Sequence, residues 1–161
     1  MTEPTTVPAA TVPRNLFWED VDIGRVYESG CRRITQADID AFGQVTGDFH
    51  PLHSDAEFCK STPYGRPIAH GLFGVSLMEG LKNQLKLYDK TSIGSLGWDK
   101  IRFIKPLFPE DTVHLDITFI SKRETRKPDR GVVVERIELK NQRGEVLSQA
   151  EHASLLLRKG A

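Results

Sequence analysis

One stretch of the chain limits its possible folds more than any other. Over residues 71–87 the sequence predicts a helix whose first two turns have almost no polar face. The apolar positions in this stretch are Leu72, Phe73, Val75, Leu77, Met78 and Leu81. A helix that is apolar on all sides has to be buried by the rest of the protein. Toward Lys82 and Lys86 the pattern becomes amphipathic, and there we expect the helix to emerge into solvent.

The second half of the chain changes to the two-residue period that is typical of strands. Val113, Leu115, Ile117 and Phe119 alternate with polar residues, which predicts a half-buried strand. Further strands are expected over residues 26–33, 92–104, 132–139 and 146–157, with a hairpin turn at residues 141–144. This order of elements predicts a single α+β domain in which an antiparallel sheet wraps around one long buried helix.

Two shorter helices are expected before the buried one. Thr35 followed by Asp38 is a start signal for a helix, which should end at Gly47. A short helix from Ser54 or Asp55 to Lys60 is also predicted, and a loop rich in proline and glycine follows it.

The bulk properties indicate one soluble domain. Residues 1–14 are rich in proline and threonine and are expected to be a disordered tail, which leaves residues 15–161 as the domain. This tail lacks the features of a signal peptide, and no apolar run approaches the ~20 residues that cross a bilayer. We therefore expect a cytoplasmic location, with Cys31 and Cys59 reduced. The 22 basic and 22 acidic residues balance, which argues against a nucleic-acid partner and gives little resistance to self-association.

The densest group of polar residues runs from Asp48 to His53. These two residues are five positions apart, so one helix face would not bring them together, but a turn at Pro51 could. A carboxylate and an imidazole that meet at one point can hold a water molecule and transfer its proton. The alternative, that Asp48 only caps a turn and His53 lies at the surface, is the more common situation for such residues.

The start of the buried helix offers a second chemical feature. His70 and Gly71 begin it, and the first N–H groups of a helix have no intrahelical partner, so they can stabilise a developing negative charge. An ordinary helix start, with Gly71 allowing close packing, explains the same residues. Ser76 in this helix either bonds back to the carbonyl four residues earlier or supports the carboxylate. Glu79 is expected to be paired, or exposed at a subunit edge.

Other chemistries find less support in the sequence. Asp48, His50, His53 and Asp55 include metal-ligand types, but no metal-binding spacing occurs and no metal is expected. No feature marks Cys59 as a nucleophile. A basic stretch at residues 122–130 is either a solvated hairpin or a contact for a phosphate group.

Two segments together resemble a known family. Residues 42–53, with Gly47-Asp48 and Pro51-Leu52-His53, and residues 64–72, with Pro67-Ile68-Ala69-His70-Gly71, resemble the signature of the MaoC-like dehydratases and (R)-specific enoyl-CoA hydratases. Residues 101–106 and 111–112 extend the similarity, which spans nearly the whole chain. One position departs from the signature, because His50 stands where the family has asparagine.

The resemblance implies a hot-dog fold, a homodimer or higher homo-oligomer, and an acyl-CoA substrate at the interface between subunits. It implies that Asp48 and His53 are catalytic and that the Gly71 N–H binds the thioester oxygen. It gives supporting roles to Ser76 and His50, and substrate contacts to Pro51, His70, Arg102 and Lys105. The implied reaction is reversible syn hydration of a trans-2-enoyl-CoA to an (R)-3-hydroxyacyl-CoA, or dehydration of a branched hydroxyacyl-CoA, with no cofactor, no membrane and no nucleic acid.

Two other functions fit the same resemblance. A hot-dog acyl-CoA thioesterase would share the fold and the ligand but would release free CoA. A non-catalytic acyl-CoA-binding subunit would keep the fold without the chemistry, and His50 in place of asparagine is the feature that favours it.

Overall fold

The computed structural model of the protein describes residues 6–7 and 12–160. Its elements in chain order are β1 (Thr6–Val7), a 3-10 helix (Trp18–Asp20), β2 (Val26–Glu28), β3 (Arg32–Arg33), α1 (Gln36–Thr46), a 3-10 turn (Pro51–His53), α2 (Ala56–Lys60), α3 (Gly71–Gln84), β4 (Ser92–Phe103), β5 (Thr112–Glu124), β6 (Arg130–Asn141) and β7 (Val146–Leu157).

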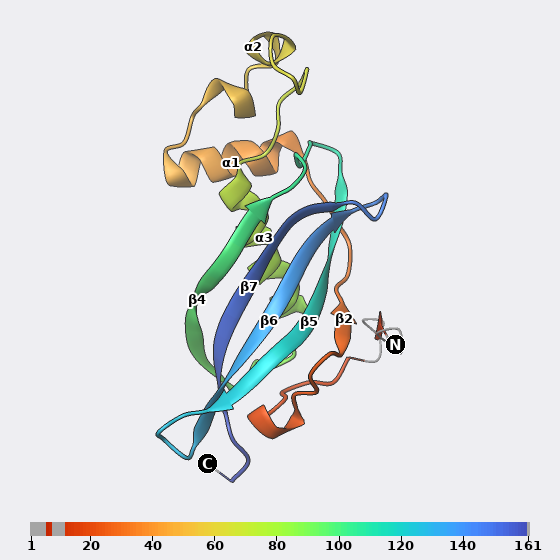
Figure 1. The fold of residues 1–161 in the computed structure, drawn as a ribbon. Coiled ribbons are helices and arrows are strands. Elements are labelled where there is room, and N and C mark those ends of the chain that lie inside the picture. Colours follow the sequence, from red (N-terminus) through yellow and green to blue (C-terminus); the bar gives the residue numbers. More distant parts are fainter. Residues whose placement is uncertain (1–5, 8–11, 161) are drawn as a thin grey trace.

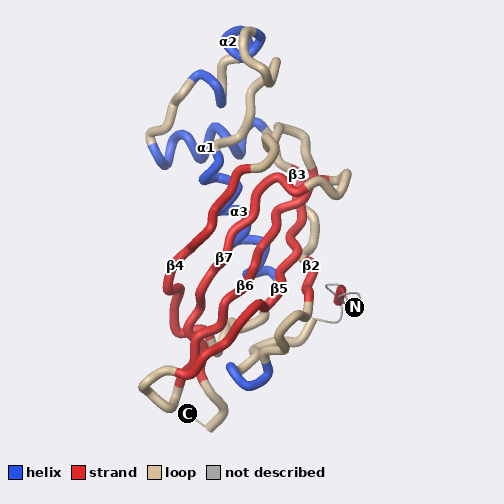
Figure 2. The backbone as a smooth tube through the Cα atoms, in the orientation of Figure 1, coloured by secondary structure: helices blue, strands red, loops and turns tan. Residues whose placement is uncertain are grey.

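One sheet runs through the molecule, and α3 lies along one of its faces (Figures 1 and 2). The strand order is β1-β2-β5-β6-β7-β4, with β3 paired to the end of β5. Every pair is antiparallel except β1 with β2. Alternate residues of β5, β6 and β7 are buried, as expected for strands with one face on a core. The prediction of an antiparallel sheet around a long helix is confirmed.

Contacts between α3 and the three central strands form the core. Phe73, Leu77, Met78 and Leu81 of α3 are buried, and they pack with inward residues of β5, β6 and β7. Helical spacing puts these four side chains on one side of the helix, where the sheet covers them.

The predicted ends of α1 and the predicted bounds of α2 are confirmed, whereas α3 ends at Gln84, three residues before its predicted end. Thr35 and Asp38 form a capping box at the start of α1, and Gly47 ends α1 in the left-handed conformation, with a φ of 77°. Asp55 caps α2 through its side chain. The strand predicted over residues 26–33 is divided into β2 and β3, because the Ser29 hydroxyl accepts from Leu115 N–H where a regular ladder bond would lie.

Two expectations about α3 are wrong. Lys82 is only 2 % exposed, so the helix does not emerge into solvent at that residue. Conversely, Leu72 is 63 % exposed and Ser76 is also exposed. In the single chain α3 therefore keeps one bare stripe, which includes Leu72, Ser76 and Gly80, on the side away from the sheet.

The N-terminal prediction lies largely outside the described residues. Within the expected disordered tail, Thr6–Val7 pair with β2 and Val12 packs against the core; for the rest, disorder stays a prediction. Among the described helices, none is long and apolar enough to cross a membrane. Both cysteines are free, with Cys31 exposed and Cys59 buried.

The packing of α3 gives the first prediction. Met78 is fully buried between the helix and the sheet, so Met78→Ala should lower the free energy of unfolding by about 2–5 kcal/mol through lost contacts and a cavity. Val45 on α1 is 87 % exposed, and Val45→Ala should change stability by less than about 0.5 kcal/mol. Denaturant unfolding of both variants checks this, and equal effects would contradict the assignment of the core.

Candidate active site

The helices before α3 gather at one end of the sheet. α1, the 3-10 turn and α2 lie beyond the end of β4, close to the start of α3 (Figure 1). Gly47 turns the chain out of α1, and Pro51 begins the 3-10 turn, where its missing N–H costs no hydrogen bond. This path carries Asp48 and His53, which come before and at the end of that turn, to the same place.

His50 stabilises the turn between them. Its Nδ1 accepts a hydrogen bond from Leu52 N–H at 3.1 Å, and its own N–H donates to an Asp48 carboxylate oxygen at 3.3 Å. A side-chain acceptor that bonds the backbone two residues on is what an asparagine supplies in a turn, so histidine can replace asparagine here. His50 is exposed and supports the loop from outside the group of side chains that meet.

The proton of His53 can be placed from its contacts. Its Nδ1 lies 2.8 Å from the carbonyl oxygen of Ile68, which can only accept, so Nδ1 carries the hydrogen. In the neutral ring Nε2 then has a free lone pair. The backbone of His53 is also fixed, because Gln36 donates its side-chain amide to the His53 carbonyl at 2.8 Å.

His70 is the residue that completes the cluster. It is buried, and its Nε2–H donates to the backbone carbonyl of Asp48 at 2.9 Å. Its ring stacks on His53 with 3.7 Å between ring centres, and Phe42 packs against its other side. Its Nδ1 is buried and has no hydrogen-bond partner among the residues described. The sequence placed His70 at the start of a helix and, through the family resemblance, among the substrate contacts, but it did not indicate that His70 would stack on His53, 17 positions earlier.

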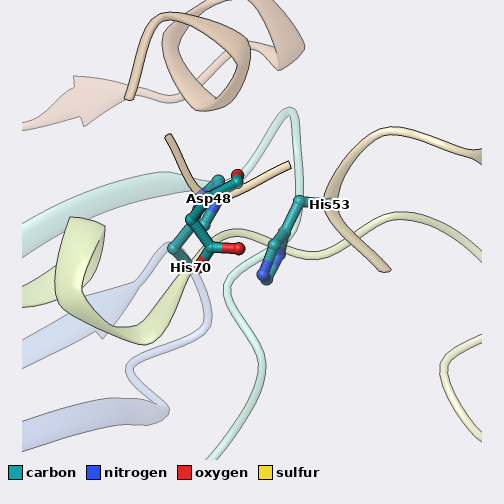
Figure 3. Close-up of side chains that lie close together, drawn as sticks. All are labelled: Asp48, His53 and His70. Carbon is teal, nitrogen blue, oxygen red and sulfur yellow. The ribbon is translucent and has the colours of Figure 1, made fainter. Parts of the chain in front are cut away.

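Asp48, His53 and His70 meet at one point (Figure 3). One ligand-type atom of each lies within 4.8 Å of the others. Two atoms that each bond one shared water at about 2.8 Å are separated by a similar distance. The ligand-type atoms of this trio are also close enough to hold a metal ion, whereas His50 and Asp55, which the sequence offered as further metal-ligand types, are not part of the trio. Both histidines of the trio already use one ring nitrogen in a hydrogen bond to a carbonyl. The expectation of no metal stays a prediction.

The electrostatics keep His53 neutral near pH 7. Burial lowers the pKa of His53 below its ordinary value, and the neighbouring His70 lowers it further, against the opposing effects of the Ile68 carbonyl and Asp48. Asp48 is exposed to solvent. The site thus pairs a solvated carboxylate with an imidazole that is free to accept a proton at Nε2.

A cavity of about 320 Å³ opens beside this trio. His53, His70, Gly71, Phe103, Lys105 and Ser148 are among the residues that line it, whereas Asp48 lines a second cavity of about 280 Å³, which His53 and His70 also line. A Cβ on Gly71 would come within 2.7 Å of the Phe103 ring, so only glycine permits this approach. Of the predicted substrate contacts, His70 and Lys105 line the cavity, whereas Pro51 and Arg102 do not.

Ser76, a predicted site residue, and Glu79, which was expected to be paired or exposed, both lie apart from the trio. The Ser76 hydroxyl donates to the Leu72 carbonyl, four residues earlier, at 3.0 Å, which is the first of the two roles predicted for it. It has no hydrogen bond to Asp48. Glu79 is paired with Lys82 at 2.9 Å. The basic hairpin lies at the opposite end of β5 and β6 (Figure 1), where Lys122 donates to the carbonyl of Val21.

Comparison with known proteins identifies the family of the chain. Residues 20–141 match the family described as MaoC like domain. The chain is 37 % identical over 95 residues to an (R)-specific enoyl-CoA hydratase of Aeromonas caviae. These aligned residues make up 59 % of this chain and 69 % of that protein. It is 35 % identical over 68 residues to a 3-hydroxybutyryl-CoA dehydratase of Methylorubrum extorquens, and this alignment covers 42 % of this chain and 43 % of that protein.

Solved structures show the same architecture. A monoamine oxidase regulatory protein of Archaeoglobus superposes with a TM-score of 0.85 and 33 % identity over 92 % of this chain and 98 % of that chain. A Mycobacterium tuberculosis protein described as a double hot-dog fold superposes with a TM-score of 0.78 over 91 % of this chain and 45 % of that one. At 18 % identity this second match speaks for the fold alone, and it confirms the hot-dog prediction.

The environment of His53 can be tested by titration. We expect an NMR titration of the His53 ring to give a pKa below 6.5, since burial and His70 both disfavour its charged form. In His70→Gln, where an amide can still donate to the Asp48 carbonyl but carries no charge, the pKa of His53 should rise. The His53 signal is the one that disappears in His53→Gln. A pKa at or above 6.5 for this signal in the unmodified protein would contradict this arrangement.

Proposed function

Because the chain belongs to the MaoC-like domain family, we propose that it is a hydro-lyase that reversibly hydrates a trans-2-enoyl-CoA to an (R)-3-hydroxyacyl-CoA. The observation that carries the proposal is that Asp48, His53 and His70 come together at one point, and that a cavity lined by both histidines opens at the start of α3. The names of the related hydratase and dehydratase support the same reaction class.

Asp48 and His53 together activate one water molecule in this proposal. The pair delivers the hydroxyl to C3 and a proton to C2 on the same face of the double bond, and the reverse steps remove water. Proton transfer by positioned side chains contributes about 10²–10⁴-fold to such reactions. Two interacting groups share their titration, so the acid and base roles belong to the pair.

Gly71 acts on the thioester carbonyl. As hydration proceeds, the carbonyl oxygen gains negative charge, and the Gly71 N–H at the positive end of α3 donates a hydrogen bond to it. The missing side chain lets the thioester reach this N–H beside the Phe103 ring. The thioester itself acidifies C2, so the reaction needs no cofactor.

The working unit in this proposal is a homodimer that packs along β4. β4 is an edge strand, so one side of its backbone has no neighbouring strand. Ile93, Leu96, Phe103 and Ile104 on or beside it are each more than 40 % exposed, as is Leu72 on the bare stripe of α3. An apolar surface of this kind is typical of a subunit interface.

Substitutions at the pair test the mechanism. Asp48→Asn and His53→Gln should each lower hydration of a trans-2-enoyl-CoA at least about 100-fold, while the unfolding transition stays close to that of the unmodified protein. Loss of the enone absorbance measures the reaction. Asp22→Asn and His114→Gln, at positions that do not line the cavities beside the trio, are the matched controls. Near-normal turnover in both site variants would refute the mechanism.

The same assay separates the rival functions. A hydratase removes the enone absorbance without releasing a thiol, whereas a thioesterase releases CoA that a thiol-reactive dye detects. A non-catalytic subunit would bind the thioester and change neither signal. Chiral analysis of the product decides whether the hydroxyl group at C3 has the (R) configuration.

A further inference from the structure

A buried polar network lies in the half of the core that the proposed mechanism does not use. Lys82 of α3 is 2 % exposed, and its Nζ lies 2.8 Å from His152 Nδ1 and 3.7 Å from a Glu135 carboxylate oxygen. Glu135 is fully buried on β6, and His152 is buried on β7. Burial raises the pKa of Glu135, but the charges and hydrogen bonds of its neighbours, among them Lys82 and Tyr88, outweigh this and leave the pKa below its ordinary value.

The neighbours of this network fix its protons. Tyr88 donates to Glu135 at 2.5 Å, and Ser154 donates to the same oxygen at 3.3 Å. An ammonium group can only donate, so the contact of Lys82 uses the lone pair of His152 Nδ1 and leaves the hydrogen on Nε2. Nε2–H then donates to the Ser95 hydroxyl at 2.7 Å, so His152 cannot act as a base toward Ser95. The Ser95 O–H remains available to a ligand.

These residues surround a cavity of about 360 Å³, within the range of ligand sites. Glu79, Lys82, Tyr88, Ser95, His152 and Ser154 are among the residues that line it. Leaving charged and polar side chains inside a core carries a large desolvation cost, and apolar residues would fill the same space at less cost. The network is therefore better explained by a ligand than by packing.

The cavity and the catalytic trio lie at opposite ends of the same helix. Eleven residues separate Gly71 from Lys82, which is about 16 Å along a helix axis, so one chain does not bring them together. β4 spans the same two ends: Ser92 and Ser95 at its start line the polar cavity, and Phe103 at its end lies against Gly71.

Symmetry changes this relation in the proposed dimer. Two copies that pack their β4 edges about a two-fold axis run these strands antiparallel, so the start of β4 in one copy lies beside the end of β4 in the other. With the axis near the middle of β4, the polar cavity of one subunit faces the end of β4 that lies beside the catalytic trio of its partner. Each site would be built from both copies.

We propose that this cavity receives the tail of the acyl group bound at the partner's catalytic trio, and that the preferred tail ends in a carboxylate. This proposal rests on the proposed function. Lys82 is the cation that binds it, and the Ser95 hydroxyl donates a second hydrogen bond. Glu79 occupies this position on Lys82 in the free protein, at 2.9 Å. Its side chain is 43 % exposed, so it can move into solvent when a substrate carboxylate arrives.

A pair of substrates tests the tail preference. Two trans-2-enoyl-CoA thioesters of equal length, one ending in methyl and one in carboxylate, are compared by kcat/KM. We expect at least about a tenfold preference for the carboxylate in the unmodified protein. Lys82→Met should abolish this preference. Glu79→Gln, which removes the competing carboxylate, should lower KM for the carboxylate-ended thioester. Lys127→Met, an exposed lysine on the far hairpin, is the matched control.

Because Lys82→Met leaves Glu135 without its cation, the double variant Lys82→Met/Glu135→Gln checks that any loss comes from recognition and not from misfolding. It should regain the unmodified unfolding temperature without regaining the preference. A double variant that recovers the preference would overturn the role of Lys82.

Mixed dimers test whether the partner supplies the cavity. A dimer of one Asp48→Asn chain and one Lys82→Met chain, isolated with two affinity tags, keeps one site in which Asp48 of one copy meets Lys82 of the other. We expect this mixed dimer to show the unmodified preference for the carboxylate-ended thioester. If cavity and trio acted within one chain, no site would keep both residues and the preference would vanish, which overturns the shared site.

Failure of this inference is distinguishable from failure of the proposed function. If both thioesters are hydrated and the methyl-ended one is equally good or better, only the carboxylate proposal fails. If neither is hydrated, the proposed function fails. Calorimetric binding of the two saturated acyl-CoA thioesters to the Asp48→Asn protein then still decides the preference, because it needs no turnover; equal affinity would overturn it.

Discussion

The packing of α3 against the inner face of β5, β6 and β7 determines where everything else in this protein lies. It buries the apolar side of the helix and fixes the helix start beneath the loop that follows α1. The hydrogen bond from His70 to the Asp48 carbonyl then joins the loop to the helix. Together with the hydrogen bond from His53 to the Ile68 carbonyl, this connection sets the distance of Asp48 and His53 from Gly71.

The sequence was sufficient for features that depend on local chemistry or on period. Thr35, Gly47 and Asp55 marked helix ends correctly because caps and left-handed glycines act over a few residues. The alternation in residues 113–119 marked β5 for the same reason. The Asp48 and His53 pair could be proposed because both lie on one short turn, and the family signature strengthened that proposal.

Features that join distant segments could not be predicted. The resemblance implied a substrate contact for His70, but its stacking on His53 and its hydrogen bond to the Asp48 carbonyl come from the fold. Lys82 was expected in solvent because a lysine near a helix end usually is, and its partners Glu135 and His152 lie 53 and 70 residues further along the chain. Ser76 was expected in the core because the helix looked apolar all round; the period cannot show that one stripe faces away from a single sheet.

The bare stripe of α3 has a consequence for the life of the protein in dilute solution. If Leu72 and the exposed residues beside β4 are covered by a second copy, part of the free energy that keeps each chain folded comes from association. The melting temperature would then fall as the protein is diluted. A newly made chain would reach full stability only after it binds a second copy. The expression level would therefore set how much folded protein accumulates.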